Sequence, residues 1–212
     1  MIPVTPPRIV ALAWTGASGM AYGLRLLSCL IRSEVEVWLI YSQAAQIVAK
    51  QELDLVLPSR PIDAEREFGA RFEARDGQLR VFGRDDWNAP LASGSNPPDA
   101  MAVCPCTTGT LAAIAAGLSD SLIERAADVM LKEQRKLVLV PRETPFSVIH
   151  LENMLTLARA GAEILPANPG FYHRPEAVEA VVDYVVARVL DHLGVKNDLM
   201  QRWGAERVLR EP

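Results

Sequence analysis

The stretch KEQRKLVLVPRETP, which spans residues 132–145, joins the charged end of a helix to a short apolar strand that delivers an arginine and a glutamate. In an open α/β sheet, ligands bind beyond the carboxyl ends of the strands. Arg142 and Glu143 follow such an end. We therefore expect them to combine capture of an anion with transfer of a proton.

The same rhythm of strand and helix continues on both sides of this stretch. Alternation of this kind predicts a Rossmann-like (flavodoxin-like) α/β fold, in which helices cover both faces of a parallel sheet in three layers. The expected strands are Ile9–Trp14, Val35–Tyr41, Met101–Cys104, Leu137–Val140 and Glu163–Leu165. The expected helices are Met20–Ile31, Ser42–Gln51, Thr108–Ala116, Ser121–Gln134, Phe146–Ala160 and Pro175–Leu193, the last with proline at its start.

Residues 57–99 interrupt this alternation. They are rich in charge, proline, glycine and serine, and only Leu79–Phe82 has the pattern of a strand. We interpret them as an excursion that contains a functional loop at residues 92–96. The 212 residues are otherwise consistent with one domain over 1–212, with a tail from about residue 194 that we expect to pack on a neighbouring subunit.

Composition narrows the class of protein. A formal net charge of −4 gives no reason to expect binding to nucleic acid. No apolar run approaches the roughly 20 residues that span a bilayer, and the first residues lack the apolar core of a secretory signal. The cysteines Cys29, Cys104 and Cys106 are few and odd in number, which favours the reducing cytoplasm. The three histidines are far apart, so no metal site is predicted.

The turn after the first strand contains Gly16, Ala17, Ser18 and Gly19. Glycines let a backbone pass close to a phosphate, and the following helix N-terminus favours negative charge. The spacing is not that of the dinucleotide motif, so an ordinary strand-to-helix turn is an equal alternative. Ser42 ends the second strand at the same sheet edge, where it is either a ligand or a helix cap.

Residues 104–110, CPCTTGT, follow the third strand. Their hydroxyls and free amides suit a phosphate or the edge of a flavin ring, and helix capping is the alternative. Cys104 is expected to pack in the strand.

Several cationic and aromatic residues could line a second anion site. Each one alone is more often a surface charge, a helix ion pair or a core ring. Arginine matches phosphate oxygens, and tyrosine offers them a hydroxyl. The candidates are Arg125, Lys132, Arg142, Tyr172 and Arg188, with Trp87 and Trp203 as walls of an apolar ligand site or as interface residues.

The order and spacing of several motifs resemble the UbiX-type flavin prenyltransferases over nearly the whole chain. These motifs are TGASG at 15–19, CPC at 104–106, RAADV at 125–129, LKE at 131–133, PRETP at 141–145, HLENM at 150–154 and FYHRP at 171–175, together with DWNAP at 86–90 and SGS at 93–95. Thr107 and Gln134 depart from the usual Ser and Arg of that family.

The resemblance implies an enzyme that joins the dimethylallyl group of dimethylallyl monophosphate to N5 and C6 of reduced FMN, without a metal. It implies a homo-oligomer, a dodecamer with sites between subunits, whose product serves a UbiD-type decarboxylase, either in ubiquinone biosynthesis or in the breakdown of aromatic acids. It places Gly16, Ala17, Ser18, Ser42, Thr107, Thr108, Gly109, Thr110 and Arg142 on FMN. It places Gly94, Arg125, Lys132, Tyr172 and Arg188 on the donor phosphate, and Trp87 and Trp203 around the prenyl group and the entrance.

For catalysis, Ser18, Glu52, Glu143 and Lys132 are the expected residues. Glu143 would protonate the leaving phosphate, which requires burial that nearby arginines oppose. Ser18 would help move the proton released on ring closure. Two other functions are weighed: a passive FMN carrier that assists a decarboxylase, and a flavin-dependent cysteine decarboxylase, which would need a histidine on the first helix where this chain has none.

Overall fold

The computed structural model describes residues 7–202. Six parallel strands form one sheet in the order β3-β2-β1-β4-β5-β6. The strands are β1 (Ile9–Trp14), β2 (Glu36–Tyr41), β3 (Leu79–Phe82), β4 (Ala100–Cys106), β5 (Lys136–Pro141) and β6 (Glu163–Ile164). The strand order reverses between β1 and β4, and such a switch point is where ligands bind in doubly wound sheets.

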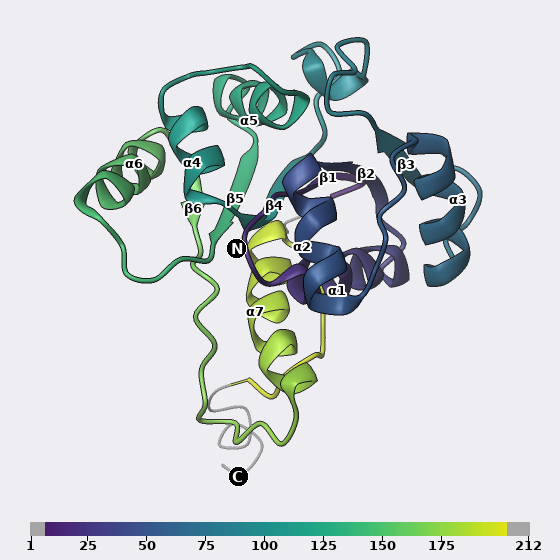
Figure 1. Cartoon of the computed structure of the whole chain (residues 1–212), viewed down its shortest axis with the longest axis vertical. Coiled ribbons are helices and arrows are strands. Elements are labelled where there is room, and N and C mark those ends of the chain that lie inside the picture. The colour runs from purple at the N-terminus through teal and green to yellow at the C-terminus, as the bar shows by residue number, and fades with distance from the viewer. Residues whose placement is uncertain (1–6, 203–212) are drawn as a thin grey trace, which may run out of the picture.

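Helices cover both faces of the sheet, which confirms the three-layer prediction (Figure 1). The helices are α1 (Met20–Arg32), α2 (Gln43–Leu53), α3 (Pro61–Phe72), α4 (Thr108–Ala115), α5 (Leu122–Lys132), α6 (Val148–Arg159) and α7 (Val178–Leu193). The 3-10 turn η1 spans Pro90–Ala92.

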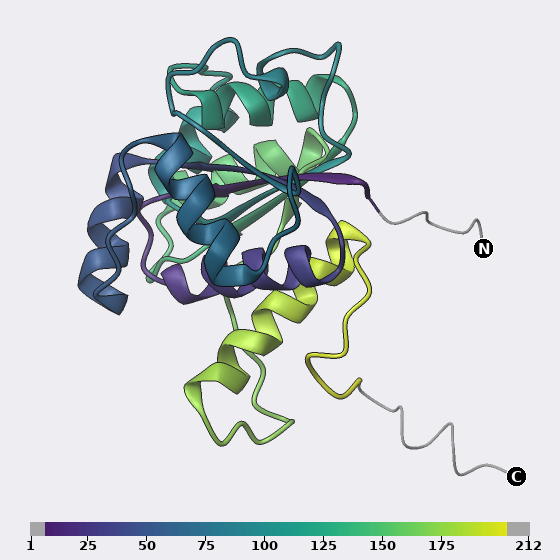
Figure 2. The same cartoon turned by 90° about the vertical axis from the view of Figure 1, so that its right-hand side faces the viewer.

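Two hydrophobic cores lie on opposite faces of the sheet because neighbouring strand residues point in opposite directions. One core joins Leu12 and Trp14 of β1 to α1, α2, α3 and α7. The other joins Ala11 and Ala13 to α4, α5 and α6. Figure 2 views the sheet edge-on, with α5 above it and α1 and α7 below.

The interpretation of residues 57–99 as an excursion is wrong for its first half. Helix α3 lies there unpredicted, and it leads into β3, which pairs in parallel with β2. Only Ala64 and Phe68 of α3 are buried among many charged residues, so the helical pattern is weak in the sequence. The loop between β3 and β4 remains irregular except for η1.

The start of the last helix also differs from the prediction. Helix α7 begins at Val178 and not at Pro175, because Arg174 has φ 52° and Ala177 is extended. The helix ends at Leu193 and is capped by Gly194, which has φ 80°. Residues 195–202 then fold back on α7, where Asn197 Nδ2 donates to Asp191 Oδ1 at 3.1 Å. Contact of the tail with a neighbouring subunit stays a prediction.

Both edges of the sheet are short. Strand β6 has two residues, and β3 has four. On β3 the guanidinium of Arg80 lies over the rings of Trp38 and Phe82, at 5.8 and 5.0 Å from their centroids.

Candidate active site

The carboxyl ends of the central strands are tied together by polar contacts. The Thr15 hydroxyl donates to the Pro105 carbonyl at 2.8 Å and accepts from the Thr107 amide at 2.8 Å. The Ser42 amide donates to the Trp14 carbonyl at 3.0 Å. The ends of β1, β2 and β4 therefore meet at one edge, as expected from the sequence.

The turn at residues 16–18 rests against the start of α2. A Cβ atom on Gly16 would lie 2.4 Å from Cβ of Ala44, so the close approach requires glycine here. Ala17 is buried, whereas Ser18 is exposed. Arg142, which follows β5, reaches back so that its Nε donates to the Ser18 carbonyl at 3.1 Å. The structure thus brings Gly16, Ala17, Ser18 and Arg142 into one cluster.

Glu52 joins this cluster from the last turn of α2. Its carboxylate accepts from the Gly19 amide at 3.0 Å and from the Met20 amide at 2.9 Å. Burial alone would raise the pKa of Glu52, but hydrogen bonds from Ser18, Met20 and Gly19 and the charge of Arg142 outweigh it and lower that pKa. Glu52 is therefore an anion at neutral pH and lies beside Ser18.

The hydroxyls predicted to hold FMN also cap helices. Ser42 accepts from the Ala45 amide at 3.1 Å, and Thr107 accepts from the Thr110 amide at 3.0 Å. The capping alternative is thereby confirmed. Thr107 also donates to the Thr110 hydroxyl at 2.8 Å. Thr108 and Gly109 form the first turn of α4 at this edge, and their contact with FMN stays a prediction.

Glu143 lies in the loop after β5, next to Arg142. Its carboxylate accepts from the Thr144 amide at 3.0 Å, and the residue is exposed. A single chain therefore does not supply the burial that the proton-donor role requires.

A second cluster, here called the α5 group, consists of Gly94, Arg125 and Lys132. Arg125 Nε donates to the Ala92 carbonyl at 2.9 Å and forms an ion pair with Asp128 at 2.7 Å. Lys132 pairs with Glu133. A Cβ on Gly94 would lie 2.5 Å from Lys132 Nζ, so the loop passes directly over the lysine. These helix ion pairs are the alternative weighed for the cations, and they leave the phosphate role as a prediction.

A third cluster, here called the α7 group, consists of Tyr172, Tyr184 and Arg188. The hydroxyls of Tyr172 and Tyr184 are 3.0 Å apart. Arg188 is one turn beyond Tyr184 on α7, where it pairs with Asp191 at 2.8 Å. Tyr172 is 52% exposed, so its ring is accessible to a ligand or a partner.

The three clusters stand apart within one chain. Lys132 precedes β5 and Arg142 follows it, so a strand about 17 Å long separates the α5 group from the Ser18 turn. The loop with Tyr172 lies at the opposite end of the molecule from α5, as both views show (Figure 1, Figure 2). One chain alone therefore does not join the predicted donor residues to the predicted flavin residues.

The two tryptophans have different outcomes. Trp87 is 50% exposed in the loop after β3, consistent with an interface or ligand wall. Trp203 lies outside the described residues. Two tyrosines near the clusters escaped the sequence reasoning. Tyr22 is half-buried on α1, and its ring packs against Gly19. The Tyr184 hydroxyl contacts that of Tyr172. Neither lies in one of the motifs above, and their helical spacing does not distinguish them from core tyrosines.

The cysteines are inert packing residues. Cys29, Cys104 and Cys106 are buried and unpaired. Burial raises the pKa of Cys106 to about 12. Burial and the nearby Cys106 thiol also raise the pKa of Cys104. Within residues 7–202, no group of His, Cys, Asp and Glu could hold a metal ion, and no helix is long and apolar enough to cross a membrane.

The residues at the strand ends fit a flavin phosphate in chemical terms. Three helices begin at this edge with amide donors, and Gly16 allows close approach of a ligand to the backbone. Comparison with known proteins agrees with this reading. The Flavoprotein family matches residues 5–190. The flavin prenyltransferase UbiX of Pseudomonas aeruginosa is 56% identical over 205 residues, which cover 97% of this chain and 98% of that protein. The chain belongs to the flavin prenyltransferase family of flavoproteins.

Two solved structures of this family share the fold closely. AnUbiX (PadA1), crystallised with FMN and dimethylallyl pyrophosphate, is 42% identical with a TM-score of 0.83, over 93% of this chain and 97% of that one. A dodecameric FMN-dependent UbiX-like decarboxylase from Escherichia coli O157:H7 is 42% identical with a TM-score of 0.81, over 92% and 98%. The family likeness therefore extends over both the strand ends and the helices that carry the three clusters.

Proposed function

We propose that this protein is a flavin prenyltransferase, which transfers the dimethylallyl group of dimethylallyl monophosphate to N5 and C6 of reduced FMN. The observation that carries the proposal is the cluster of Ser18, Glu52 and Arg142 at the switch point of the sheet. This cluster places a cation, a carboxylate and a hydroxyl side by side. The relative from Pseudomonas aeruginosa is named as a flavin prenyltransferase.

Different residues of the chain have different roles in the reaction. FMN supplies the nucleophilic N5 and C6 when it is bound in its reduced form. The guanidinium of Arg142 binds a negatively charged group beside the Ser18 turn. Gly16 lets the flavin come close to the backbone, where the amides at the start of α4 can donate to it. As the allylic C–O bond breaks, Lys132, Arg125, Arg142 and Arg188 neutralise the leaving phosphate, and Glu143 gives it a proton. Trp87 stabilises positive charge on the five-carbon fragment through its ring face. The Ser18 hydroxyl passes the proton that ring closure at C6 releases to the carboxylate of Glu52, to which it is hydrogen-bonded.

We further propose that the site is assembled from several copies. The α5 group, the α7 group and the Ser18 turn are too far apart in one chain to hold one pair of substrates. Assembly would bring them together and would bury Glu143. The exposed apolar side chains of α6, namely Val148, Ile149, Leu151 and Leu155, provide a face for it. A dodecamer is the form we expect, in accord with the relative from Escherichia coli.

Mass spectrometry tests the activity directly. The protein is incubated anaerobically with reduced FMN and either dimethylallyl monophosphate or dimethylallyl pyrophosphate, in parallel with and without a chelator. We expect a flavin heavier by one five-carbon unit with the monophosphate, and the same yield with the chelator. Unchanged FMN with both donors would refute the proposal, and loss of product on chelation would refute the metal-free mechanism.

The same experiment separates the other candidate functions. A passive FMN carrier would return FMN unchanged, and it would have no use for the cations of the α5 group. A cysteine decarboxylase would consume a cysteine-containing peptide instead of the isoprenoid. We place the enzyme in the cytoplasm and its product with a UbiD-type decarboxylase.

A further inference from the structure

The segment before α7 is folded around a single side chain, Tyr184. The Tyr172 ring meets the Tyr184 ring edge-on, with 5.7 Å between centroids, and the His173 ring stacks on it at 5.5 Å and 10°. A Cβ atom on Gly170 would lie 2.8 Å from Cζ of Tyr184. Residues 170–173 thus follow the shape of this tyrosine.

The polar contact between the tyrosines joins two hydroxyls 3.0 Å apart, either of which can donate. The hydrogen bond to Tyr172, followed by burial, raises the pKa of Tyr184. Tyr184 therefore keeps its proton at neutral pH and can donate it to the Tyr172 oxygen. When its hydroxyl donates to the Tyr172 oxygen, the proton of Tyr172 is directed to another acceptor, and the two hydroxyls form a chain that strengthens the outer donor.

The same helix carries the cation that belongs with this donor. Arg188 lies four residues after Tyr184 on α7, and its charge acts on Tyr184. An anion beside Tyr172 would therefore meet a directed hydroxyl and a guanidinium from one rigid element.

We infer that Tyr184 is a positioning residue for the prenyl donor: it orients the Tyr172 hydroxyl toward the donor phosphate beside Arg188. The inference rests on the proposed function. Because Tyr184 acts through the Tyr172 hydroxyl, it should affect capture of the donor and not the later chemistry.

The test compares Tyr184→Phe, Tyr172→Phe and the double variant with the wild type in the prenylation assay. Phenylalanine keeps the stacking on His173 and Tyr172 and removes only the hydroxyl. Because one neutral hydrogen bond is lost, we expect Tyr184→Phe to raise KM for dimethylallyl monophosphate by about threefold to tenfold, with kcat and FMN affinity unchanged. The double variant should match Tyr172→Phe, because the two hydroxyls act as one unit.

A second variant checks the geometry by another route. Gly170→Ala places a methyl group against the Tyr184 ring and should also raise KM for the donor while leaving FMN affinity unchanged. An unchanged KM in Tyr184→Phe, additive effects in the double variant, or an equal loss of FMN affinity would each overturn the inference. If the wild type itself yields no prenylated flavin, the proposed function fails and the inference with it, whereas product from wild type with no effect in Tyr184→Phe refutes the inference alone.

Discussion

At the scale of the residue, Glu143 is the group whose role depends most on its surroundings. It follows Arg142 at the end of β5 and is exposed in the single chain. A proton donor to the leaving phosphate needs a protonated carboxyl, whereas FMN binding needs only the neighbouring arginine. The two roles can therefore be separated by substitution.

We expect Glu143→Gln to retain FMN and to lose product formation by about a hundredfold or more, the usual loss for a general acid. Turnover is followed by mass spectrometry and FMN content by absorbance. Glu34→Gln removes an exposed carboxylate in the turn before β2, at the amino end of the strands, and is the matched control. Wild-type turnover in Glu143→Gln would remove this residue from the mechanism.

Glu52 offers a test of the charge at the Ser18 turn. Its pKa is lowered from an ordinary value of 4.5. A carboxyl group with a lowered pKa stabilises the folded state fully above its ordinary pKa, and this stabilisation is lost as the pH falls through the folded-state pKa.

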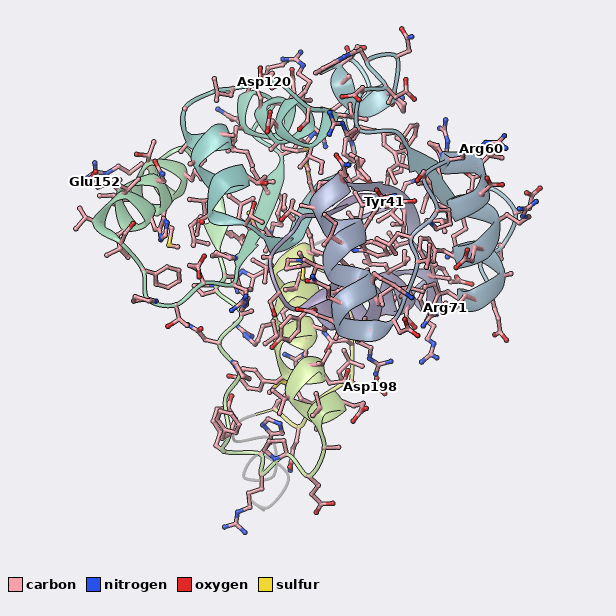
Figure 3. All side chains as sticks on the ribbon, in the orientation of Figure 1. Tyr41, Arg60, Arg71, Asp120, Glu152 and Asp198 are labelled. Carbon is pink, nitrogen blue, oxygen red and sulfur yellow. The ribbon has the colours of Figure 1, made fainter. Side chains whose placement is uncertain are left out.

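The free energy of unfolding should therefore differ between wild type and Glu52→Gln at pH 7, and the two should converge as the pH falls below 4.5. Urea titrations at several pH values measure the difference. Glu152→Gln, whose side chain points outward from α6 (Figure 3), controls for the loss of one carboxylate. A difference that persists unchanged in acid would contradict the assigned charge.

At the scale of the element, helix α5 is fixed at its start by a capping box. Ser121 accepts from the Glu124 amide at 3.5 Å, and Glu124 accepts from the Ser121 amide at 3.0 Å. This box sets the position of the helix that carries Arg125 and Lys132.

Ser121→Ala should lower the free energy of unfolding by about 1 kcal/mol, because a partly buried helix start loses its side-chain acceptor. Ser121→Thr retains the hydroxyl and should stay close to the wild type. Urea unfolding monitored by circular dichroism gives both values. Equal stability of Ser121→Ala and Ser121→Thr would show that the cap contributes nothing.

Elements with a strong apolar pattern could be predicted from the sequence, and elements without one could not. The buried strands β1, β2, β4 and β5 and most helices were placed within a few residues. Helix α3 was missed because its two buried side chains give little periodic signal. The start of α7 was misplaced because Pro175 is a favoured first residue in general, whereas here residues 175–177 form the turn before the helix.

The meeting of residues at the strand ends could be predicted from the order of the strands and did not depend on an apolar pattern. Parallel strands all end at one edge, so the meeting of the Ser18 turn with Arg142 could be expected from their order. The separation of the α5 group from the α7 group could not be predicted from the sequence, because it depends on which face of the sheet each helix covers. Tyr184 was missed because nothing in the spacing of α7 distinguishes it from a core tyrosine.

At the scale of the whole molecule, the separated clusters give a test of shared sites. Lys132→Ala should weaken donor binding more than FMN binding, and Tyr172→Phe should weaken donor binding as well.

If different copies supply the two residues, a mixed assembly contains some sites in which both are wild type. Co-expression of the two variants with different tags, followed by tandem purification, should therefore restore product formation above either variant alone. Homogeneous assemblies of each variant, mixed after purification, are the control. No recovery in the co-expressed sample would place both residues in the same chain's site.

The two narrow edges of the sheet have a consequence for how copies can join. A strand pair needs a run of free backbone donors and acceptors, which the two residues of β6 barely provide. At the other edge, the Val81 amide of β3 already donates to the Glu65 carboxylate of α3 at 3.1 Å, so a foreign strand would lack this backbone donor. Growth into an endless ribbon is thereby disfavoured at either side. Copies of this chain are left to meet through their helices and loops, which favours a finite, closed shell.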